Sequence, residues 1–306
     1  MDYLLGSTSN QTLSSPVELH DGVASLSRGT FFKEASLDMT LSVLAESAGQ
    51  MSGVERVSIW ALTAGYQELR CLELFQRRSG EHSSGEVLRA EQYPAYFRAL
   101  EGVNGIAADD PYLHPATIEL GRDYLLKHRI TALLDTPIHI RGELQGVLCL
   151  EQVDSHAPWT TAQRIFAQAV ANLVTLALVE FEAGEARRQV VNATERLKAV
   201  FEGSRDALLL ADGDSGLVLD ANAQAEKLFG CQRSEIVGKH QKSLHPNNSE
   251  SVVSEQFRQV ASGQLSTVVV TEVLCANGAV KAVEITAEVA DLSDGHRLVL
   301  GIFRQI

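Results

Sequence analysis

Apolar residues along this chain follow two periods, and the switches between them predict its secondary structure. From Lys33 to Gln50, apolar residues recur every three or four positions, which predicts an amphipathic helix. Arg56 to Leu62 and Glu68 to Gln76 instead alternate between apolar and polar residues, which predicts two strands of an antiparallel hairpin. The first folded region therefore begins with a helix that leads into a hairpin.

A short helix and a second hairpin follow. Residues 91–105 predict the helix, because Pro94 occupies a first-turn position and glycines come after it. Residues 131–140 and 145–153 alternate again and predict two strands around an RGEL turn. A long helical stretch then opens at Trp159.

One apolar seam continues from Ile165 to Phe201 at helical spacing. A helix of 37 residues would span about 55 Å. Its flanks carry charges of alternating sign, so we expect a homodimer formed through the helix 165–201. The alternative is a solvated linker helix that lies on its own domain. Between its two ends, the seam consists of Ala169, Leu173, Leu176, Phe181, Gly184, Val191, Thr194 and Leu197.

The second region repeats the strand and helix patterns in another order. Two strands, a helical patch and three strands predict a small antiparallel sheet with helices over one face. The predicted strands are 206–212, 216–220, 265–275, 279–290 and 296–304, and the predicted helices are 221–230 and 249–262.

These elements predict an α+β protein with two domains, each an antiparallel sheet with helices, joined by a long helix. Residues 1–30 are rich in Ser, Thr and Gly, so we interpret them as a flexible leader. The predicted parts are the leader 1–30, a first domain 31–182, a connecting helix 165–201 and a second domain 202–306.

Composition narrows the class of protein. Apolar residues make up 45% and charged residues 21% of the 306 residues, as in soluble globular proteins. Polar residues interrupt the most apolar segment, 167–181, so no stretch approaches the roughly 20 apolar residues of a membrane span. The N-terminus lacks the pattern of a secretory signal, and we expect a cytoplasmic protein.

Charge and cysteine usage exclude two further classes. A net charge of −13 argues against nucleic acid as a partner, because phosphate binding requires clustered Lys and Arg. The four cysteines form no CxxC pair, so neither a disulfide framework nor a zinc ribbon is expected. Cys149 lies in an apolar strand, where burial makes a thiol inert.

The second region resembles a PAS domain over about residues 196–306. The resemblance rests on the segments DANAQAEKLFG, SEIVGK, LHP and NGAVKAVEIT and on the closing VLGIFRQI. Asn222 is positioned to cap the helix after the second strand, and Gly230 to end it. In many relatives the last strand continues into an output helix. We therefore expect a sensory fragment that precedes a C-terminal output domain.

The first region resembles a GAF domain over about residues 31–182. The resemblance rests on VERVSIWAL, on the hairpin LLDTPIHIRGELQGVLCLEQV and on the returning segment PWTTAQRIFAQAVANLVTLAL. The segments YPAYFRAL and DDPYLHPATIEL resemble the cavity-covering segments of a group of bacterial GAF domains found ahead of cyclic-di-GMP enzymes and histidine kinases. The expected output is cyclic-di-GMP turnover, with a histidine kinase as the alternative, and the fragment itself is expected to have no catalytic activity.

Both resemblances imply a cavity between a sheet and its covering helices, and we expect an unidentified small ligand in the first domain. The sequence shows neither the Asn-Lys-X-Phe-Asp-Glu pattern of cyclic-nucleotide GAF domains nor the Asn-Cys-Arg-Phe-Leu-Gln run of flavin PAS domains. The candidate ligand-binding residues are Trp60, Phe75, Tyr93, Tyr96, Phe97, Asp109, Asp110, His114 and Tyr124.

The sequence gives little evidence for a haem site, a metal site or a catalytic site. His240 and His245 are weak candidates for a haem ligand, because PAS domains that bind haem use a helical His as the axial ligand. The competing interpretation of the whole protein is a gas or redox sensor that depends on haem or flavin. His114 and Glu119 lack the spacing of a metal site. No phosphate loop or nucleophile elbow occurs. We expect no cofactor, metal or catalytic residue.

Overall fold

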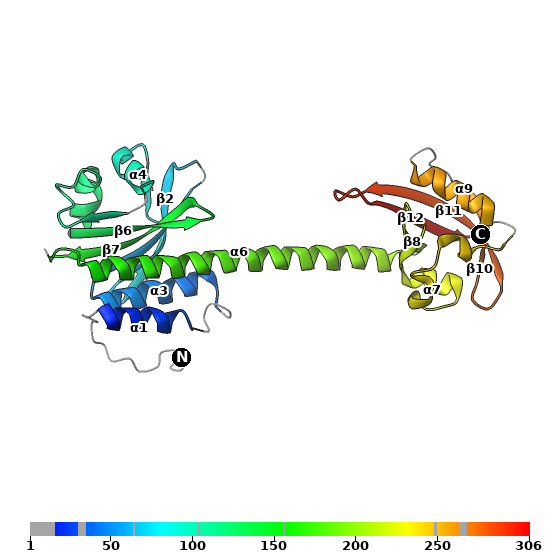
Figure 1. Ribbon diagram of the computed structural model, residues 1–306, viewed down its shortest axis with the longest axis horizontal. Helices are drawn as coiled ribbons and strands as arrows, with labels where there is room; N and C mark the ends of the chain where they lie inside the picture. The colour runs from blue at the N-terminus through cyan, green and yellow to red at the C-terminus, as the bar shows by residue number, and fades with distance from the viewer. Residues whose placement is uncertain are drawn as a thin grey trace. The chain divides into compact units, whose positions relative to one another are not determined.

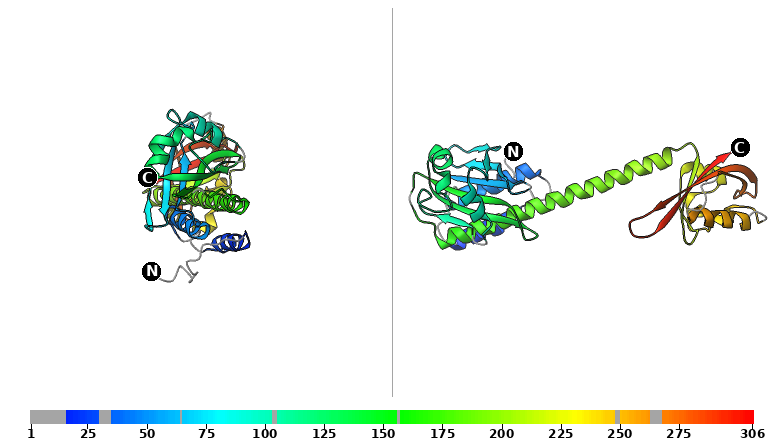
Figure 2. Two further views of the ribbon diagram at one scale, coloured as in Figure 1. Left: turned by 90° about the vertical axis from the view of Figure 1, so that its left-hand side faces the viewer. Right: turned by 90° about the horizontal axis from the view of Figure 1, so that it is seen from above.

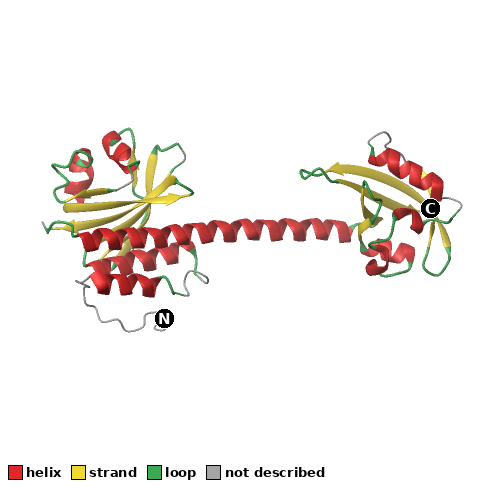
Figure 3. Cartoon of the chain, in the orientation of Figure 1, coloured by secondary structure: helices red, strands yellow, loops and turns green. Residues whose placement is uncertain are grey.

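The computed structural model describes residues 16–29, 35–63, 65–102, 105–155, 157–247, 250–262 and 268–306. The chain divides into two compact units, Met1–Arg187 and Arg188–Ile306, which we call the first and second domains. Each contains a sheet, drawn in yellow in Figure 3, and helices, drawn in red. All strand pairs are antiparallel, so the predicted α+β fold class is confirmed.

The first domain is built on a sheet that has seven strands within the described residues. The strand order is β3-β2-β1-β7-β6-β5, and β4 also pairs with β2. The strands are β1 (Arg56–Leu62), β2 (Glu68–Gln76), β3 (Glu81–Ser83), β4 (Val87–Arg89), β5 (Ile106–Ala108), β6 (Ile130–Ile140) and β7 (Glu143–Val153).

Helical segments cover both faces of this sheet (Figure 1). The helices α1 (Pro16–Leu26), α3 (Leu37–Ser52) and α6 (Thr161–Gly203) lie on one face, and α4 (Pro94–Leu100) lies on the other. The short segments η1 (Ile118–Leu120), η2 (Gly121–Leu125) and α5 (Leu126–His128) follow α4 along the chain. Leu120 and Leu125 share a buried cluster with Leu100 of α4.

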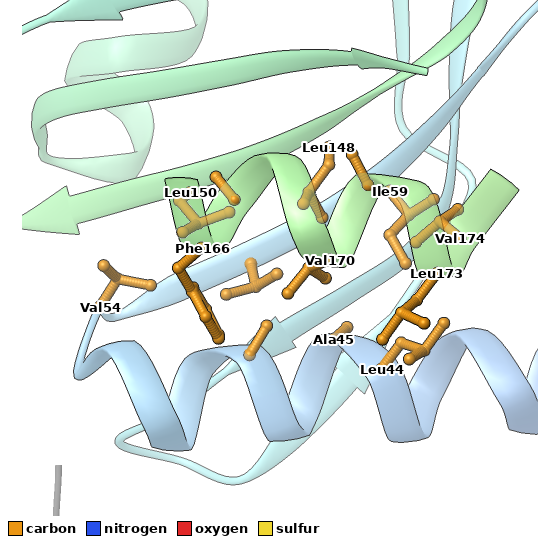
Figure 4. Close-up of a cluster of buried hydrophobic side chains, with 14 of the residues drawn as sticks. Leu44, Ala45, Val54, Ile59, Leu148, Leu150, Phe166, Val170, Leu173 and Val174 are labelled. Carbon is orange, nitrogen blue, oxygen red and sulfur yellow. The ribbon is translucent and has the colours of Figure 1, made fainter. Parts of the chain in front are cut away.

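The core between α3, α6 and the sheet is apolar throughout. Figure 4 shows Phe166, Val170 and Leu173 of α6 among side chains of α3, β1 and β7. Helix α3 begins at Ser36, whose hydroxyl accepts a hydrogen bond from the Met39 backbone N–H. Fixed ends and an apolar face on each helix therefore hold both helices against the sheet.

Part of the predicted flexible leader is helical. Helix α1 occupies residues 16–26, and its Leu26 is buried in the same core, with Val23 packed against it. Val23 and Leu26 are three positions apart, so both project from one face of the helix. Burial of that face explains why this segment is ordered, whereas residues 1–15 and 30 lie outside the described residues.

Helix α6 runs for 43 residues from Thr161 to Gly203. In the described part of the chain it is the one helix that could cross a membrane by length and composition, with 39% of its most apolar window buried inside the protein. Figure 4 shows Leu173 pointing toward α3, and this residue belongs to the core of the first domain. Part of the hydropathy of α6 is therefore that of a core helix.

The second domain is built on a sheet of order β10-β11-β12-β8-β9. This domain is drawn in yellow to red in Figures 1 and 2. Its helices cover one face of the sheet, because α7 packs against Phe303 and α9 against Val299, which lie on the same side of β12. The strands are β8 (Ala207–Asp212), β9 (Val218–Ala221), β10 (Val268–Leu274), β11 (Val280–Asp291) and β12 (Arg297–Gln305). The helices are α7 (Ala223–Phe229), α8 (Arg233–Ile236), η3 (Gln241–Leu244) and α9 (Glu250–Ala261).

Asn222 joins the end of α6 to this sheet through four hydrogen bonds. Its side-chain oxygen accepts from the backbone N–H of Leu208 and of Ala225, both at 2.9 Å. Its amide nitrogen donates to the carbonyls of Phe201 at 3.0 Å and Asp206 at 3.1 Å. The predicted capping of α7 by Asn222 is confirmed, and the same side chain also ties α6 to β8.

Replacement of Asn222 by Asp should destabilise the second domain. The two buried N–H donations to carbonyls are lost, and a carboxylate is placed against the same carbonyls. We expect the free energy of unfolding to fall by about 2–4 kcal/mol. Urea unfolding followed by NMR signals of the second domain measures the effect.

The matched control is Asn277→Asp. Asn277 lies in an exposed turn, where its oxygen accepts from the Ala279 N–H and an aspartate can do the same. This variant should unfold like the wild type. Equal stability of both variants would contradict the role given to Asn222.

Candidate functional site

The second domain has a cavity of about 80 Å³ between its sheet and the covering segments η3 and α9. Most of the surrounding side chains are aliphatic or aromatic. Gly301 of β12 contributes no side chain, and a Cβ there would lie 2.9 Å from the Phe303 ring. The apolar lining residues are Leu209, Ala211, Val218, Leu244, Val253, Phe257, Val260, Val269, Ile285, Ala287, Val299, Gly301 and Phe303.

Four polar side chains also line the cavity, namely Gln241, His245, Gln256 and Thr271. Gln241 and His245 are buried, and the Gln241 amide nitrogen has no hydrogen-bond partner among the described residues. His245 Nδ1 lies 2.7 Å from the Glu272 carbonyl oxygen. Burial lowers the pKa of His245, which keeps the imidazole neutral at physiological pH.

The sequence predicted His245 as a weak haem candidate and did not single out Gln241. His240, the other candidate, lies away from the cavity, because its ring packs against Gly216 and its Nδ1 accepts from the Lys242 N–H. Gln241 carries no motif of its own. The signal that could have identified it is a polar residue just before the buried Leu244 in the covering segment.

Five of the residues predicted to bind a ligand in the first domain gather on one face of its sheet. Trp60 and Tyr124 make an edge-on ring contact at 6.1 Å, and Tyr96 and Phe97 make another at 6.1 Å. Tyr93 belongs to the same buried cluster. These five aromatics lie beneath or within the covering segments α4 and η2.

The other four predicted residues lie elsewhere. Phe75 is on the opposite face, packed against Gly49 of α3. The Asp109 carboxylate accepts from the Trp159 backbone N–H at 2.7 Å. Asp110 and His114 accept from backbone N–H groups two residues further on. The two aspartates and the histidine therefore have local structural partners.

Two buried carboxylates connect the aromatic cluster to the sheet. The Tyr96 hydroxyl donates to Asp135 at 2.7 Å, and the Tyr124 hydroxyl donates to Glu151 at 2.7 Å. Glu151 also pairs with Arg56 at 2.8 Å. Sequence reasoning missed these residues, although an acidic residue inside each apolar strand of the second hairpin was the available signal.

Asp135 is the buried carboxyl with the most unusual protonation. Burial raises its pKa to about 7, against the opposing effect of hydrogen bonds from the Cys149 thiol and the Tyr96 hydroxyl. Burial also raises the pKa of the Cys149 thiol well above its usual range, which confirms the prediction of an inert cysteine.

Asp135→Asn should remove a pH-dependent loss of stability in the first domain. Because the folded-state pKa of about 7 lies above the ordinary 3.8, the contribution of this carboxyl is fully present below about pH 4 and is lost as pH rises through 7. Relative to wild type, the variant should gain about 2 kcal/mol between pH 5.5 and 8.5.

Urea unfolding monitored by tryptophan fluorescence measures this gain. Both tryptophans, Trp60 and Trp159, are buried in the first domain. The control Asp110→Asn changes an exposed carboxyl of the same domain and should follow wild type at both pH values. Parallel pH profiles for wild type and Asp135→Asn would contradict the prediction.

Comparison with known proteins assigns each of the two domains to a known family. The model of the GAF domain family matches residues 36–178, and that of the PAS fold matches residues 201–306. No curated protein matches the chain.

Solved structures similar to the chain include domains of both kinds. One is the GAF domain of a phosphoenolpyruvate-protein phosphotransferase from Coxiella burnetii, with 17% identity, 56% of this chain and 99% of that chain covered, and a TM-score of 0.45. Another is the PAS domain of an HTR-like protein from Haloarcula marismortui, with 21% identity, 40% and 99% covered, and a TM-score of 0.34.

A third is a domain of a sensory box sensor histidine kinase/response regulator from Geobacter sulfurreducens, with 23% identity, 38% and 96% covered, and a TM-score of 0.33. The two family matches follow one another along the chain without overlap. The chain therefore contains a GAF domain at residues 36–178 followed by a PAS domain at residues 201–306, and is a sensory module.

Proposed function

We propose that this module senses a small molecule in the cavity of the PAS domain. The observation that carries the proposal is the buried amide nitrogen of Gln241, a residue that lines an apolar cavity, because this nitrogen has no hydrogen-bond partner among the described residues. A buried donor without a partner is costly, and a ligand that accepts its hydrogen bond recovers that cost. The aromatic face of the GAF domain is a second candidate site.

A path for the signal leads from the cavity to α6. Leu209 and Ala211 of β8 line the cavity, and the neighbouring Leu208 donates its backbone N–H to Asn222. Asn222 in turn donates to the Phe201 carbonyl at the end of α6. A ligand that shifts β8 would therefore change the hydrogen bonds that hold the last turn of α6.

We also propose that α6 forms a homodimer, through a set of residues that shares only Leu176 and Leu197 with the predicted seam. Leu173 of that seam is buried in the first domain and cannot face a partner. A second set repeats at alternating steps of three and four, is exposed throughout, and matches the spacing of a coiled coil. This heptad stripe consists of Leu176, Val179, Ala183, Ala186, Val190, Ala193, Leu197 and Val200.

For the output we propose control of cyclic-di-GMP turnover by a domain that follows the module, in the cytoplasm. A histidine kinase is the second candidate for this output domain. The families matched in this chain are sensory ones, and we propose that the module itself catalyses no reaction.

The competing haem or flavin sensor fits the cavity poorly. Pockets for drug-sized ligands occupy about 300–1,000 Å³, several times the 80 Å³ present here. His245, the buried histidine, also has its Nδ1 engaged by the Glu272 carbonyl. A purified protein with haem or flavin absorption would favour that alternative.

Filling the cavity should abolish binding of a small apolar probe. Ala287 of β11 lines the cavity, whereas Ala290 of the same strand is exposed. Xenon binds in apolar cavities, so it should shift the methyl NMR signals of Leu209 and Val299 in wild type and in Ala290→Leu, but not in Ala287→Leu. Equal xenon shifts in all three proteins would contradict the assigned cavity.

Adjacent valines on α6 test the dimer and its register. Val190 belongs to the heptad stripe and Val191 to the predicted seam, and both are exposed. A charge buried in a helix interface disrupts it, so Val190→Glu should be a monomer and Val191→Glu a dimer.

Sedimentation of both variants and of wild type at micromolar concentration measures the mass. A monomeric wild type would overturn the dimer. A monomer for Val191→Glu together with a dimer for Val190→Glu would overturn the heptad stripe.

A further inference from the structure

The two buried polar groups of the PAS cavity offer one hydrogen-bond donor and one acceptor. The Gln241 amide nitrogen is a donor without a partner among the described residues. His245 Nδ1 faces the Glu272 carbonyl oxygen, and because a carbonyl only accepts, Nδ1 carries the proton. In the neutral ring Nε2 is then an acceptor. His245 is buried and lines the cavity.

The rest of the cavity limits the charge and size of an occupant. None of the described lining residues is Asp, Glu, Lys or Arg, so a charged ligand would have no counter-ion there. The volume of about 80 Å³ is roughly half that of a cavity that binds benzene, about 150 Å³. An occupant of about three to five non-hydrogen atoms fits this space.

We propose that the PAS cavity binds a small neutral alcohol. Its hydroxyl oxygen accepts a hydrogen bond from the Gln241 amide, and its hydroxyl group donates a hydrogen bond to His245 Nε2. A hydroxyl is the smallest group that both donates and accepts. A short aliphatic chain on it fills the apolar remainder beside Val299, Val260 and Leu209. The inference rests on the proposed function, since it names the class of ligand for the same cavity.

Water is the other occupant with the same hydrogen-bonding ability. A single water needs about 10–15 Å³ and two to four polar partners. Gln241 and His245 offer two such partners, but most of the 80 Å³ is surrounded by apolar side chains. A hydroxyl with carbon atoms attached satisfies both the polar end and the apolar remainder.

The test compares 1-propanol with 1-chloropropane, which has nearly the same shape but no hydroxyl proton and only a weak acceptor. Each is titrated into the full chain with methyl-labelled Ile, Leu and Val, and the shifts of the cavity methyl groups are followed by NMR. A ligand of four non-hydrogen atoms reaches a Kd no tighter than about tens of micromolar, so the titration extends into the millimolar range. We expect 1-propanol to bind at least about tenfold more tightly.

Two variants with the same substitution identify the group that recognises the hydroxyl. Gln241→Leu removes the unpartnered amide and should lower the affinity for 1-propanol about tenfold, without lowering the affinity for 1-chloropropane. Gln256→Leu changes a half-buried lining residue and should retain the preference for 1-propanol. A loss of the preference in Gln256→Leu but not in Gln241→Leu would overturn the assignment of the donor.

Each remaining outcome has a defined meaning. Equal affinity of wild type for the two probes would overturn the alcohol while leaving a sensing cavity in place. Binding of neither probe, together with an absence of xenon shifts, would overturn the proposed function as well. If Gln241→Leu does not fold, the comparison of the two probes on wild type still decides the ligand class.

Discussion

The second domain depends on the side-chain amide of one asparagine. Asn222 is fully buried and makes four hydrogen bonds, to the end of α6, the segment before β8, β8 itself and the first turn of α7. An amide is the one neutral side-chain group that donates and accepts in this way, so neither Asp nor Leu can replace it. Because β8 also lines the cavity, the residue that fixes the fold is also the one through which a bound ligand would act on α6.

The two domains use the face beneath their covering segments in opposite ways. In the GAF domain, aromatic rings fill the space, and two tyrosine hydroxyls bind the buried carboxylates of Asp135 and Glu151. In the PAS domain, Gly301 and Ala287 leave room, and the Gln241 amide lacks a partner among the described residues. A face filled by aromatic rings favours one rigid state, whereas a hollow face with an unsatisfied donor favours a ligand.

Local sequence patterns predicted most of the fold, whereas features that depend on contacts between distant segments were not predicted. Strands β1 and β2 have the predicted bounds, and the cap at Asn222 follows from its place between strand and helix. The predicted seam on α6 wrongly included Leu173, because the spacing of this residue does not reveal that its own domain covers it. The resemblances implied a cavity in each domain, but the lining residues of the second cavity were not predicted, because Gln241 and Ala287 are far apart in sequence and line it together only in the folded domain.

Amide hydrogen exchange tests the link between the cavity and α6 most directly. The probes are the backbone N–H groups of Leu208 and Ala225, which both donate to Asn222. If occupancy of the cavity is transmitted through this residue, saturating 1-propanol should change both exchange rates several-fold relative to the free protein. Changes confined to η3 and α9, with the Leu208 and Ala225 rates unaltered, would contradict the account.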